Sequence, residues 1–383
     1  MKYSVEDVVD AVDTRDALPD WHAARAQLAR ERDDVNGYIA RGGRAYGFTT
    51  FFGHLDDRDA TAEDQRTLLD YHLVGKPQVL DARRARGLLA VKLCQLSHGG
   101  SGASTALYDA LLAAWGSDLD DIAVDLTASY GSGDVVVGSQ MLNGLVQDTP
   151  VELAAGDVMA FINGSWVGAG VAVADFIDVS RTLFVARDVT QRASAMAGAI
   201  THVQAPVTVR DANPLTDVVE GSVEALAQAL DHSLNNPSAN PRFVYGDAGE
   251  LRAVSTSQFL NFRLGQTISG VADALRVASA YLVGVTRWAA GAYESMTTSA
   301  PDAARFVQYP KVSKGYYDHT ADSACAPTYA QAESVGTEDI GDMTCAKACS
   351  LAPLVEIVTE QTRLATGVLD ALDSALVSVS ASD

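Results

Sequence analysis

The sequence predicts a mainly α-helical protein with a long helical bundle in its second half. Three long stretches in that half look helical, at about residues 218–234, 256–294 and 343–378. In the first half, residues 21–39 carry apolar side chains at helical spacing among charged ones. The sequence shows no internal repeat. We therefore expect the helices to bury their apolar faces in one shared bundle.

The first half is expected to alternate helices with glycine-rich turns. Its first helical stretch begins with Ser4 followed by acidic residues, an arrangement typical of a helix start. Glycines then cluster at 41–44 and at 98–102, where we expect the chain to turn. The expected helices of this half span residues 4–40, 60–74, 82–98 and 104 onward.

Three short stretches fit neither a helix nor an amphipathic strand. Residues 46–53, YGFTTFFG, are either a hydrophobic loop packed under helices or a loop that presents the Tyr46 hydroxyl to a pocket. Residues 131–134, GSGD, are a common turn sequence. They lack the spacing of a nucleophile elbow or of a dinucleotide fingerprint. Asn163 ends an apolar run, where its amide can satisfy local backbone groups.

Two irregular stretches interrupt the second half. Residues 201–214 contain one conspicuous charge, Arg210, and a lone arginine in such a place is usually a surface residue or a helix-end partner. Residues 297–335 are expected to be mostly irregular. A loop of that length inside a helical domain is usually functional.

The composition bounds the class of protein and its partners. The chain has 383 residues, 48% of them hydrophobic and 20% charged, as in ordinary globular proteins. Its formal net charge of −21 argues against a nucleic-acid partner, which needs a basic face. The cysteines and histidines lack zinc-site spacing, so we expect no metal. The sequence opens without an apolar signal core and contains no long apolar run, so we expect a cytoplasmic protein without a membrane partner.

Taken together, these stretches resemble the aromatic amino acid ammonia-lyase and aminomutase family, which includes the histidine, phenylalanine and tyrosine enzymes. Residues 46–53 are similar to that family's Y-G-x-x-T-G-F-G loop, 131–134 lie where it has Ala-Ser-Gly-Asp, and 161–165 resemble L-I-N-G-T. Four more family motifs are Q-x-N-L…S-G, Q-D-x-Y-S-x-R, N-x-x-x-D-N-P and P-T-x-x-x-Q-E-D. The segments similar to them are, in that order, 65–75 followed by 92–102, 204–210, 235–241 and 327–334. Seven motifs in the same order argue against chance.

The resemblance implies an ammonia-lyase-like fold. An N-terminal globular domain, residues 1–170, would carry the electrophile loop, and residues 171–383 would form the long helical bundle. It also implies a homotetramer in which each pocket takes residues from three subunits. Tyr46, Ser132 and Arg210 therefore need not meet within one chain.

The resemblance also implies a self-formed electrophile. In that family the Ala-Ser-Gly segment cyclises and loses two waters to give a methylidene-imidazolone (MIO). Here Gly131, Ser132 and Gly133 would form it, without a metal. The Gly133 nitrogen must attack the Gly131 carbonyl, so the backbone must fold tightly and needs small neighbours. The amine of an amino acid substrate then adds to the methylene, ammonia departs, and an arylacrylate remains.

The matched motifs imply the other site residues. Tyr46 would remove the Cβ proton as a phenolate, Asn163 would contact the electrophile and the amine, and Arg210 would clamp the substrate carboxylate through a bidentate pair. The remaining residues that the motifs place in the pocket are Gln204, Asn240 and Glu333.

His72-Leu73 lies where family members read the substrate ring. A His-Leu pair resembles the tyrosine-selective enzymes, where the imidazole hydrogen-bonds a phenol. Alternatively, His72 is an ordinary histidine on the surface of a helix. The resemblance therefore implies an ammonia-lyase acting on tyrosine or a tyrosine derivative. Two alternatives stay open: an aromatic amino acid 2,3-aminomutase, and a homologue without the electrophile whose function is altered or is binding only.

Several positions depart from the family's pattern. Gly131 replaces the usual Ala, and a more flexible Gly is expected to make the compressed geometry less favoured before cyclisation. Val207 stands where a second active-site tyrosine is usual, Ser334 replaces the Asp that follows the glutamate, and Trp166 follows Asn-Gly-Ser. These departures fit a specialised homologue of secondary metabolism, an altered reaction, or a protein that has lost the electrophile.

Overall fold

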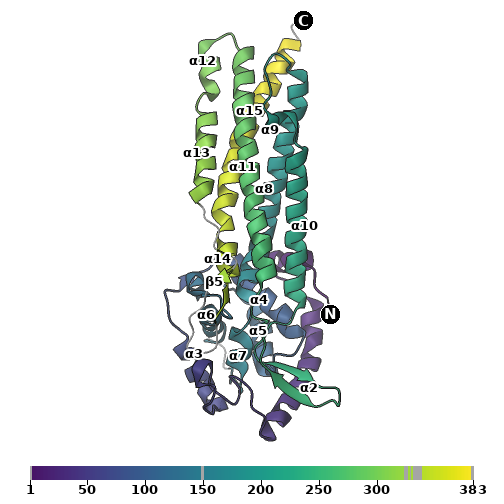
Figure 1. The fold of residues 1–383 in the computed structure, drawn as a ribbon, viewed down its shortest axis with the longest axis vertical. Helices are drawn as coiled ribbons and strands as arrows, with labels where there is room; N and C mark the ends of the chain where they lie inside the picture. The colour runs from purple at the N-terminus through teal and green to yellow at the C-terminus, as the bar shows by residue number, and fades with distance from the viewer. Residues whose placement is uncertain (1, 148–150, 323–326, 328, 331–338, 381–383) are drawn as a thin grey trace. The chain divides into compact units, whose positions relative to one another are not determined.

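The computed structural model describes residues 2–147, 151–322, 327, 329–330 and 339–380. The fold is mainly α-helical, as the sequence predicts (Figure 1). The helices up to residue 200 are α1 (Val5–Thr14), α2 (Pro19–Ala40), α3 (Gln65–Tyr71), α4 (Ala82–Ser97), α5 (Thr105–Trp115), α6 (Val135–Val146), α7 (Asp157–Ile162) and α8 (Trp166–Ala199). The later helices are α9 (Val207–Arg210), α10 (Asn213–Asn235), α11 (Phe262–Met296), α12 (Ala300–Ala303), α13 (Tyr309–Asp322), α14 (Thr344–Cys349) and α15 (Leu351–Ser380).

Short strands pair in antiparallel, two-stranded sheets. The pairs are β1 (Gln78–Val79) with β2 (Ala123–Val124), β3 (Arg242–Tyr245) with β4 (Leu251–Val254), and β5 (Tyr329–Ala330) with β6 (Gly341–Asp342). The first pair joins segments that are far apart in the sequence, whereas β3 and β4, and likewise β5 and β6, are close neighbours along the chain.

The chain forms two compact units. The first contains residues 1–176, 227–266 and 326–349, and the second contains residues 177–226, 267–325 and 350–383. This grouping differs from the predicted single division at residue 170, because α8, α10 and α11 each contribute residues to both units. Figure 1 shows the second unit as long helices that lie alongside one another.

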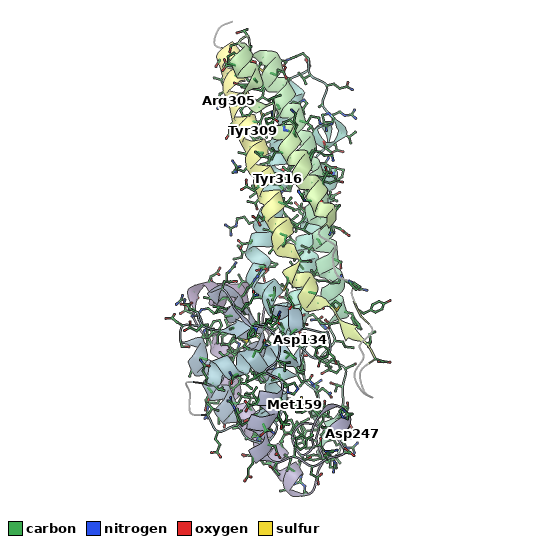
Figure 2. The ribbon with its side chains drawn as sticks, turned by 90° about the vertical axis from the view of Figure 1, so that its left-hand side faces the viewer. Asp134, Met159, Asp247, Arg305, Tyr309 and Tyr316 are labelled. Carbon is green, nitrogen blue, oxygen red and sulfur yellow. The ribbon has the colours of Figure 1, made fainter. Side chains whose placement is uncertain are left out.

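The structure corrects two of the predicted elements. The sequence predicts residues 297–335 as mostly irregular, but α13 forms within them and packs against α15. Helix α13 is rich in polar and aromatic residues such as Tyr309 and Tyr316 (Figure 2), so it lacks a strong apolar stripe. The predicted helix at 4–40 divides where Arg15 adopts a left-handed backbone (φ 68°), and α2 follows with a proline at its start.

One helix among the described residues, α11, is long and apolar enough to cross a membrane by length and composition alone. Half of its most apolar window is buried within the protein. A core helix passes the same test, so this result does not assign α11 to a membrane.

Helix α4 is buried at every position from 85 to 97. This stretch includes Lys92, whose Nζ has no hydrogen-bond partner among the described residues. Nζ lies 5.5 Å from the centre of the Phe161 ring and 5.6 Å from that of Trp166. Burial lowers the pKa of Lys92 to about 7, because the charged form loses its hydration. The first unit therefore keeps a destabilising amine in its core.

We expect Lys92→Met to stabilise the protein, most strongly at low pH. The folded-state pKa lies below the unfolded value of about 10.4, so the penalty is complete below pH 7 and disappears as the pH rises towards 10. The free energy of unfolding should rise by a few kcal/mol at pH 6 and by little at pH 10. Denaturant unfolding at both pH values measures this, with the exposed Lys311→Met as the control. A variant that is less stable than the wild type at pH 6 would contradict the argument.

Candidate functional site

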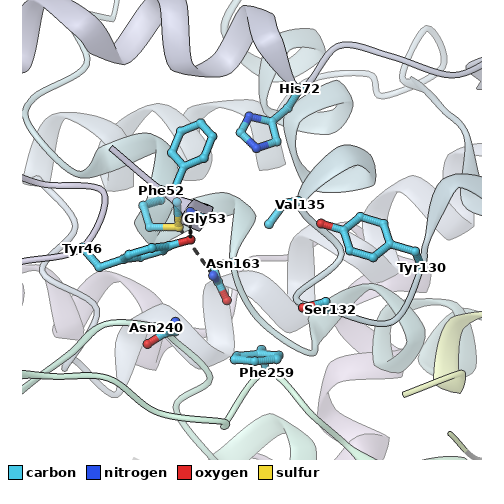
Figure 3. Close-up of a pocket in the computed structure, with 11 residues that line it drawn as sticks. Tyr46, Phe52, Gly53, His72, Tyr130, Ser132, Val135, Asn163, Asn240 and Phe259 are labelled. Carbon is cyan, nitrogen blue, oxygen red and sulfur yellow. Dashed lines mark hydrogen bonds between the residues drawn. The ribbon is translucent and has the colours of Figure 1, made fainter. Parts of the chain in front are cut away.

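One pocket in the first unit brings together five of the residues that the sequence motifs single out. It encloses about 500 Å³, including space open to solvent (Figure 3). Its lining residues are Tyr46, Phe52, Gly53, His72, Tyr130, Ser132, Val135, Met159, Asn163, Asn240 and Phe259. Five of these were expected from the sequence, namely Tyr46, His72, Ser132, Asn163 and Asn240.

The loop at residues 46–53 presents Tyr46 to the pocket. Gly47 has a left-handed backbone (φ 70°), and a Cβ there would lie 2.7 Å from the Met159 side chain, so glycine lets the loop pass directly over α7. The Tyr46 hydroxyl oxygen accepts the N–H of Gly53 at 2.8 Å. Phe48 is buried beneath the loop. Both features that the sequence offered as alternatives, a packed loop and a presented hydroxyl, are present.

Residues 131–134 form a tight turn at the start of α6. The backbones of Gly131, Gly133 and Asp134 are left-handed, with φ of 83°, 77° and 52°. Left-handed backbone costs glycine little and Asp less than most residues, which explains the residue types found here. Ser132, between the two glycines, is 6% exposed and lines the pocket.

The carbonyl groups of this turn are held by other segments of the first unit. The Gly131 oxygen accepts the N–H of Asp342 at 2.8 Å, and the Gly133 oxygen accepts that of Gly164 at 3.2 Å. Asn163 packs its amide against Gly133, and its Oδ1 has no hydrogen-bond partner among the described residues. A buried amide oxygen without a partner is costly, so this atom is available to a bound group.

His72 forms one wall of the pocket, with the Phe52 ring 4.5 Å away between ring centres. Its Nδ1 lies 2.8 Å from the Leu68 carbonyl oxygen. Because a carbonyl only accepts, Nδ1 carries the proton. Burial lowers the pKa of His72, so the ring is neutral at pH 7 and Nε2 is a hydrogen-bond acceptor.

Asn240 lies at the edge of the pocket and borders a second hollow. Its Oδ1 accepts the N–H of Thr256 at 3.0 Å and the hydroxyl of Ser255 at 3.3 Å. The second hollow shares Tyr46 and Asn240 with the pocket and is also lined by Asp339. Part of the Asn240 amide is thus used to hold the neighbouring loop.

The pocket does not include every predicted residue. Gln204 and Arg210 belong to the second unit, where both are exposed. Leu73 is half-buried and does not line the pocket. Gly131 and Gly133 adjoin it through the turn that carries Ser132. Glu333 lies outside the described residues.

Several residues that line the pocket or the second hollow were not expected from the sequence. Phe259 and Tyr130 carry no motif of their own, although Tyr130 directly precedes the Gly-Ser-Gly turn. The sequence could have indicated Asp339, because Glu338-Asp339 matches the Glu-Asp pair of the Q-E-D motif. Glu333, in contrast, is followed by Ser. Among the described residues, no group of three or more His, Cys, Asp or Glu side chains is placed to hold a metal ion.

Comparison with known sequences gives matches that cover about half of the chain. A family model described as aromatic amino acid lyase matches residues 3–208. A probable histidine ammonia-lyase of Halobacterium salinarum is 26% identical over 219 residues, covering 50% of this chain and 40% of that relative. The aligned part of the chain thus spans less than half the length of this curated relative.

Solved structures share the fold over nearly the whole chain. A tyrosine aminomutase of Streptomyces globisporus superimposes with a TM-score of 0.77 at 15% identity, covering 97% of this chain and 87% of that one. A histidine ammonia-lyase of Trypanosoma cruzi superimposes with a TM-score of 0.76 at 16% identity, covering 98% of this chain and 84% of that one. At such identities the likeness shows the fold alone, and it confirms the predicted ammonia-lyase-like architecture.

The last residue of the turn, Asp134, carries a buried carboxyl group. Asp134 is 9% exposed, and one of its oxygens accepts the hydroxyl of Ser129. Burial raises the pKa of Asp134 to about 7, and the nearby carboxylate of Asp342 adds to this rise. The folded protein therefore holds a proton here that the unfolded chain releases near pH 4.

We expect Asp134→Asn to stabilise the protein as the pH rises. An acid whose folded-state pKa is raised binds more protons in the folded state, so the wild type loses stability between pH 4 and pH 7. Asn tolerates the left-handed backbone and cannot ionise, so the variant should gain up to a few kcal/mol above pH 7 and almost nothing below pH 4. Thermal unfolding across this range tests the idea, with the exposed Asp247→Asn as the control. Equal pH profiles for variant and wild type would refute it.

Proposed function

This chain belongs to the aromatic amino acid lyase family, and we propose that it eliminates ammonia from tyrosine or a tyrosine derivative to give an arylacrylate. The observation that carries the proposal is that Tyr46, Ser132 and Asn163, from three separate segments, line one pocket. A base, an electrophile precursor and an amide are the groups that such an elimination needs within reach of one substrate.

The residues of the turn suit the self-formed electrophile. Gly131 and Gly133 place no side chain inside the tight turn, and both already have left-handed backbones. Ser132 is held at the pocket, and the unpartnered Oδ1 of Asn163 lies against Gly133. The methylidene-imidazolone formed from these three residues would supply an electrophile for the substrate amine.

Tyr46 is proposed to remove the Cβ proton of the substrate. The N–H of Gly53 donates to its hydroxyl oxygen, and a donor at that oxygen stabilises the phenolate more than the phenol. Figure 3 shows the Tyr46 hydroxyl pointing towards the amide of Asn163. The base and the amide therefore approach a substrate from the same side of the pocket.

His72 is proposed to select the substrate ring. With Nδ1 donating to the Leu68 carbonyl, Nε2 can only accept a hydrogen bond at neutral pH. A phenol hydroxyl donates to such an acceptor, whereas a phenylalanine ring has nothing to donate. An imidazole N–H is also a donor, so histidine belongs among the substrates to be compared.

Two other outcomes of the same site are kept as alternatives. An aromatic amino acid 2,3-aminomutase would use the same residues and return ammonia to the neighbouring carbon, so the product, a β-amino acid or an arylacrylate, distinguishes the two. A homologue without the electrophile would keep Ser132 unmodified and would show no loss of water in its intact mass.

A homotetramer is proposed to complete the site. Gln204 and Arg210 are exposed in the second unit and do not line the pocket of the first. A carboxylate clamp from Arg210 of another copy would supply the cation that the described lining lacks. The proposed tetramer would also bring Glu333 to the same pocket.

The central test combines intact mass with the Tyr46→Phe variant. Wild-type protein should weigh less than its sequence by two water molecules. Tyr46→Phe should retain that loss, because only a hydroxyl is removed, and its kcat should fall by at least about 100-fold. A near-normal kcat would mean that Tyr46 only packs the loop, and an unmodified wild-type mass would exclude both electrophile-dependent reactions.

His72→Phe is expected to shift the preference from tyrosine towards phenylalanine. Without the imidazole, the substrate hydroxyl stays unpaired in the pocket, which costs about 1–3 kcal/mol, or up to about 100-fold in selectivity. The ratio of kcat/KM for tyrosine, phenylalanine and histidine measures the shift. His72→Gln, which restores a polar group, is the control and should recover part of the preference; an unchanged ratio in His72→Phe would show that His72 does not read the ring.

Subunit complementation tests the proposed tetramer. Tyr46→Phe and Arg210→Met should each be poorly active alone. Co-assembled, they should recover activity, because some pockets then combine an intact Tyr46 from one chain with an intact Arg210 from another. If both residues served one pocket from the same chain, every pocket would carry one defect, and mixing would recover nothing.

A further inference from the structure

The peptide of Gly131 lies directly against the backbone of β6. The N–H of Asp342 donates to the Gly131 carbonyl oxygen at 2.8 Å. A Cβ on Gly131 would lie 2.3 Å from the Asp342 carbonyl oxygen, and a Cβ on Gly341 would lie 2.9 Å from the Tyr130 carbonyl oxygen. In both cases the obstacle is backbone, which cannot turn aside as a side chain can. Only glycine at both positions allows this contact.

The side chain of Asp342 fixes the position of the Asp342 N–H group. Asp342 is 7% exposed, and its carboxylate accepts the N–H groups of Asn261 and of Thr344, the latter at 3.0 Å. The Thr344 hydroxyl in turn donates to the Asn261 carbonyl at 3.1 Å. The Asp342 N–H is therefore oriented before any chemistry occurs at Gly131.

We propose that the Asp342 N–H is the oxyanion donor for ring closure of the Gly131-Ser132-Gly133 turn, and that Gly131 is required to admit it. The proposal rests on the proposed function, since it concerns how the electrophile forms. It assigns to β6 a role in maturation of the protein and not in turnover of substrate.

The chemistry places charge on the atom that Asp342 contacts. The Gly133 nitrogen bonds to the Gly131 carbonyl carbon, and the carbonyl π electrons move onto its oxygen. That oxygen takes up the proton lost by the Gly133 nitrogen and leaves as water with the hydrogen of the Ser132 nitrogen, forming a C=N bond. The second water comes from the Ser132 hydroxyl and its Cα hydrogen, so no oxidant is needed. A preorganised N–H at the developing oxyanion lowers the barrier of the first step.

The most direct test replaces the Asp342 N–H alone. Cell-free synthesis of the full chain with malic acid, the α-hydroxy analogue of aspartate, at position 342 turns this N–H into an ester oxygen. A time course of intact mass then follows the loss of two waters, and circular dichroism checks folding. We expect the ester variant to mature about 100-fold more slowly than the wild type, as for loss of one oxyanion donor. An ester at Gly42, whose N–H donates to Ile39, is the matched control and should mature normally.

A second variant tests whether the close contact between Gly131 and the Asp342 backbone matters. Gly131→Ala should slow maturation, whereas Gly42→Ala, at the same φ of 83° but with open space around its Cβ, should not. An unmodified wild-type mass overturns the proposed function together with this inference. A mature wild type whose ester variant, or whose folded Gly131→Ala variant, matures equally fast overturns this inference alone.

Discussion

The site depends on how the buried backbone of its loops is satisfied. The loop at residues 98–104 contacts the start of α7, and several of its N–H groups have no partner in a helix or a sheet ladder. Two carboxylates, half-buried Glu31 and buried Asp157, accept these N–H groups instead. Glu31 accepts the N–H groups of Gly100 and Gly102 at 2.7 and 2.9 Å, and Asp157 accepts that of Ser104 at 2.8 Å. Burial raises the pKa of both acids, so the loops are held at a cost in desolvation.

These anchors also set the position of the pocket residues. Asp157 begins α7, which ends at the residue before Asn163, so fixing its first turn fixes the amide at its end. Arg32 reaches the same region and donates to the carbonyl oxygens of Gly102 and Ala155. Residues that do not line the pocket therefore determine where Asn163 lies relative to Ser132.

Local patterns in the sequence predict much of this arrangement, and the remainder depends on contacts that have no local signature. Apolar spacing and capping residues predict most helices, and the order of the motifs leads to Tyr46, Ser132 and Asn163. Spacing along the chain does not reveal that Asp342 contacts Gly131, because the two are joined only by tertiary packing. Helix α13 was missed for a related reason, since the side chains it buries, Ser313 and Thr320, are polar and leave no apolar stripe.

The contact at Gly131 also changes how the departure from the family's Ala is interpreted. From the sequence, a flexible glycine is expected to oppose the compressed geometry, because it has more conformational freedom to lose. In the structure that freedom is already lost on folding, since the Asp342 N–H holds the Gly131 carbonyl and the Gly164 N–H holds that of Gly133. The entropic cost is therefore met by the fold as a whole and would not fall on the proposed ring closure. The absence of a methyl group is what lets a backbone N–H reach the carbonyl, so the same substitution that loosens an isolated peptide tightens this turn.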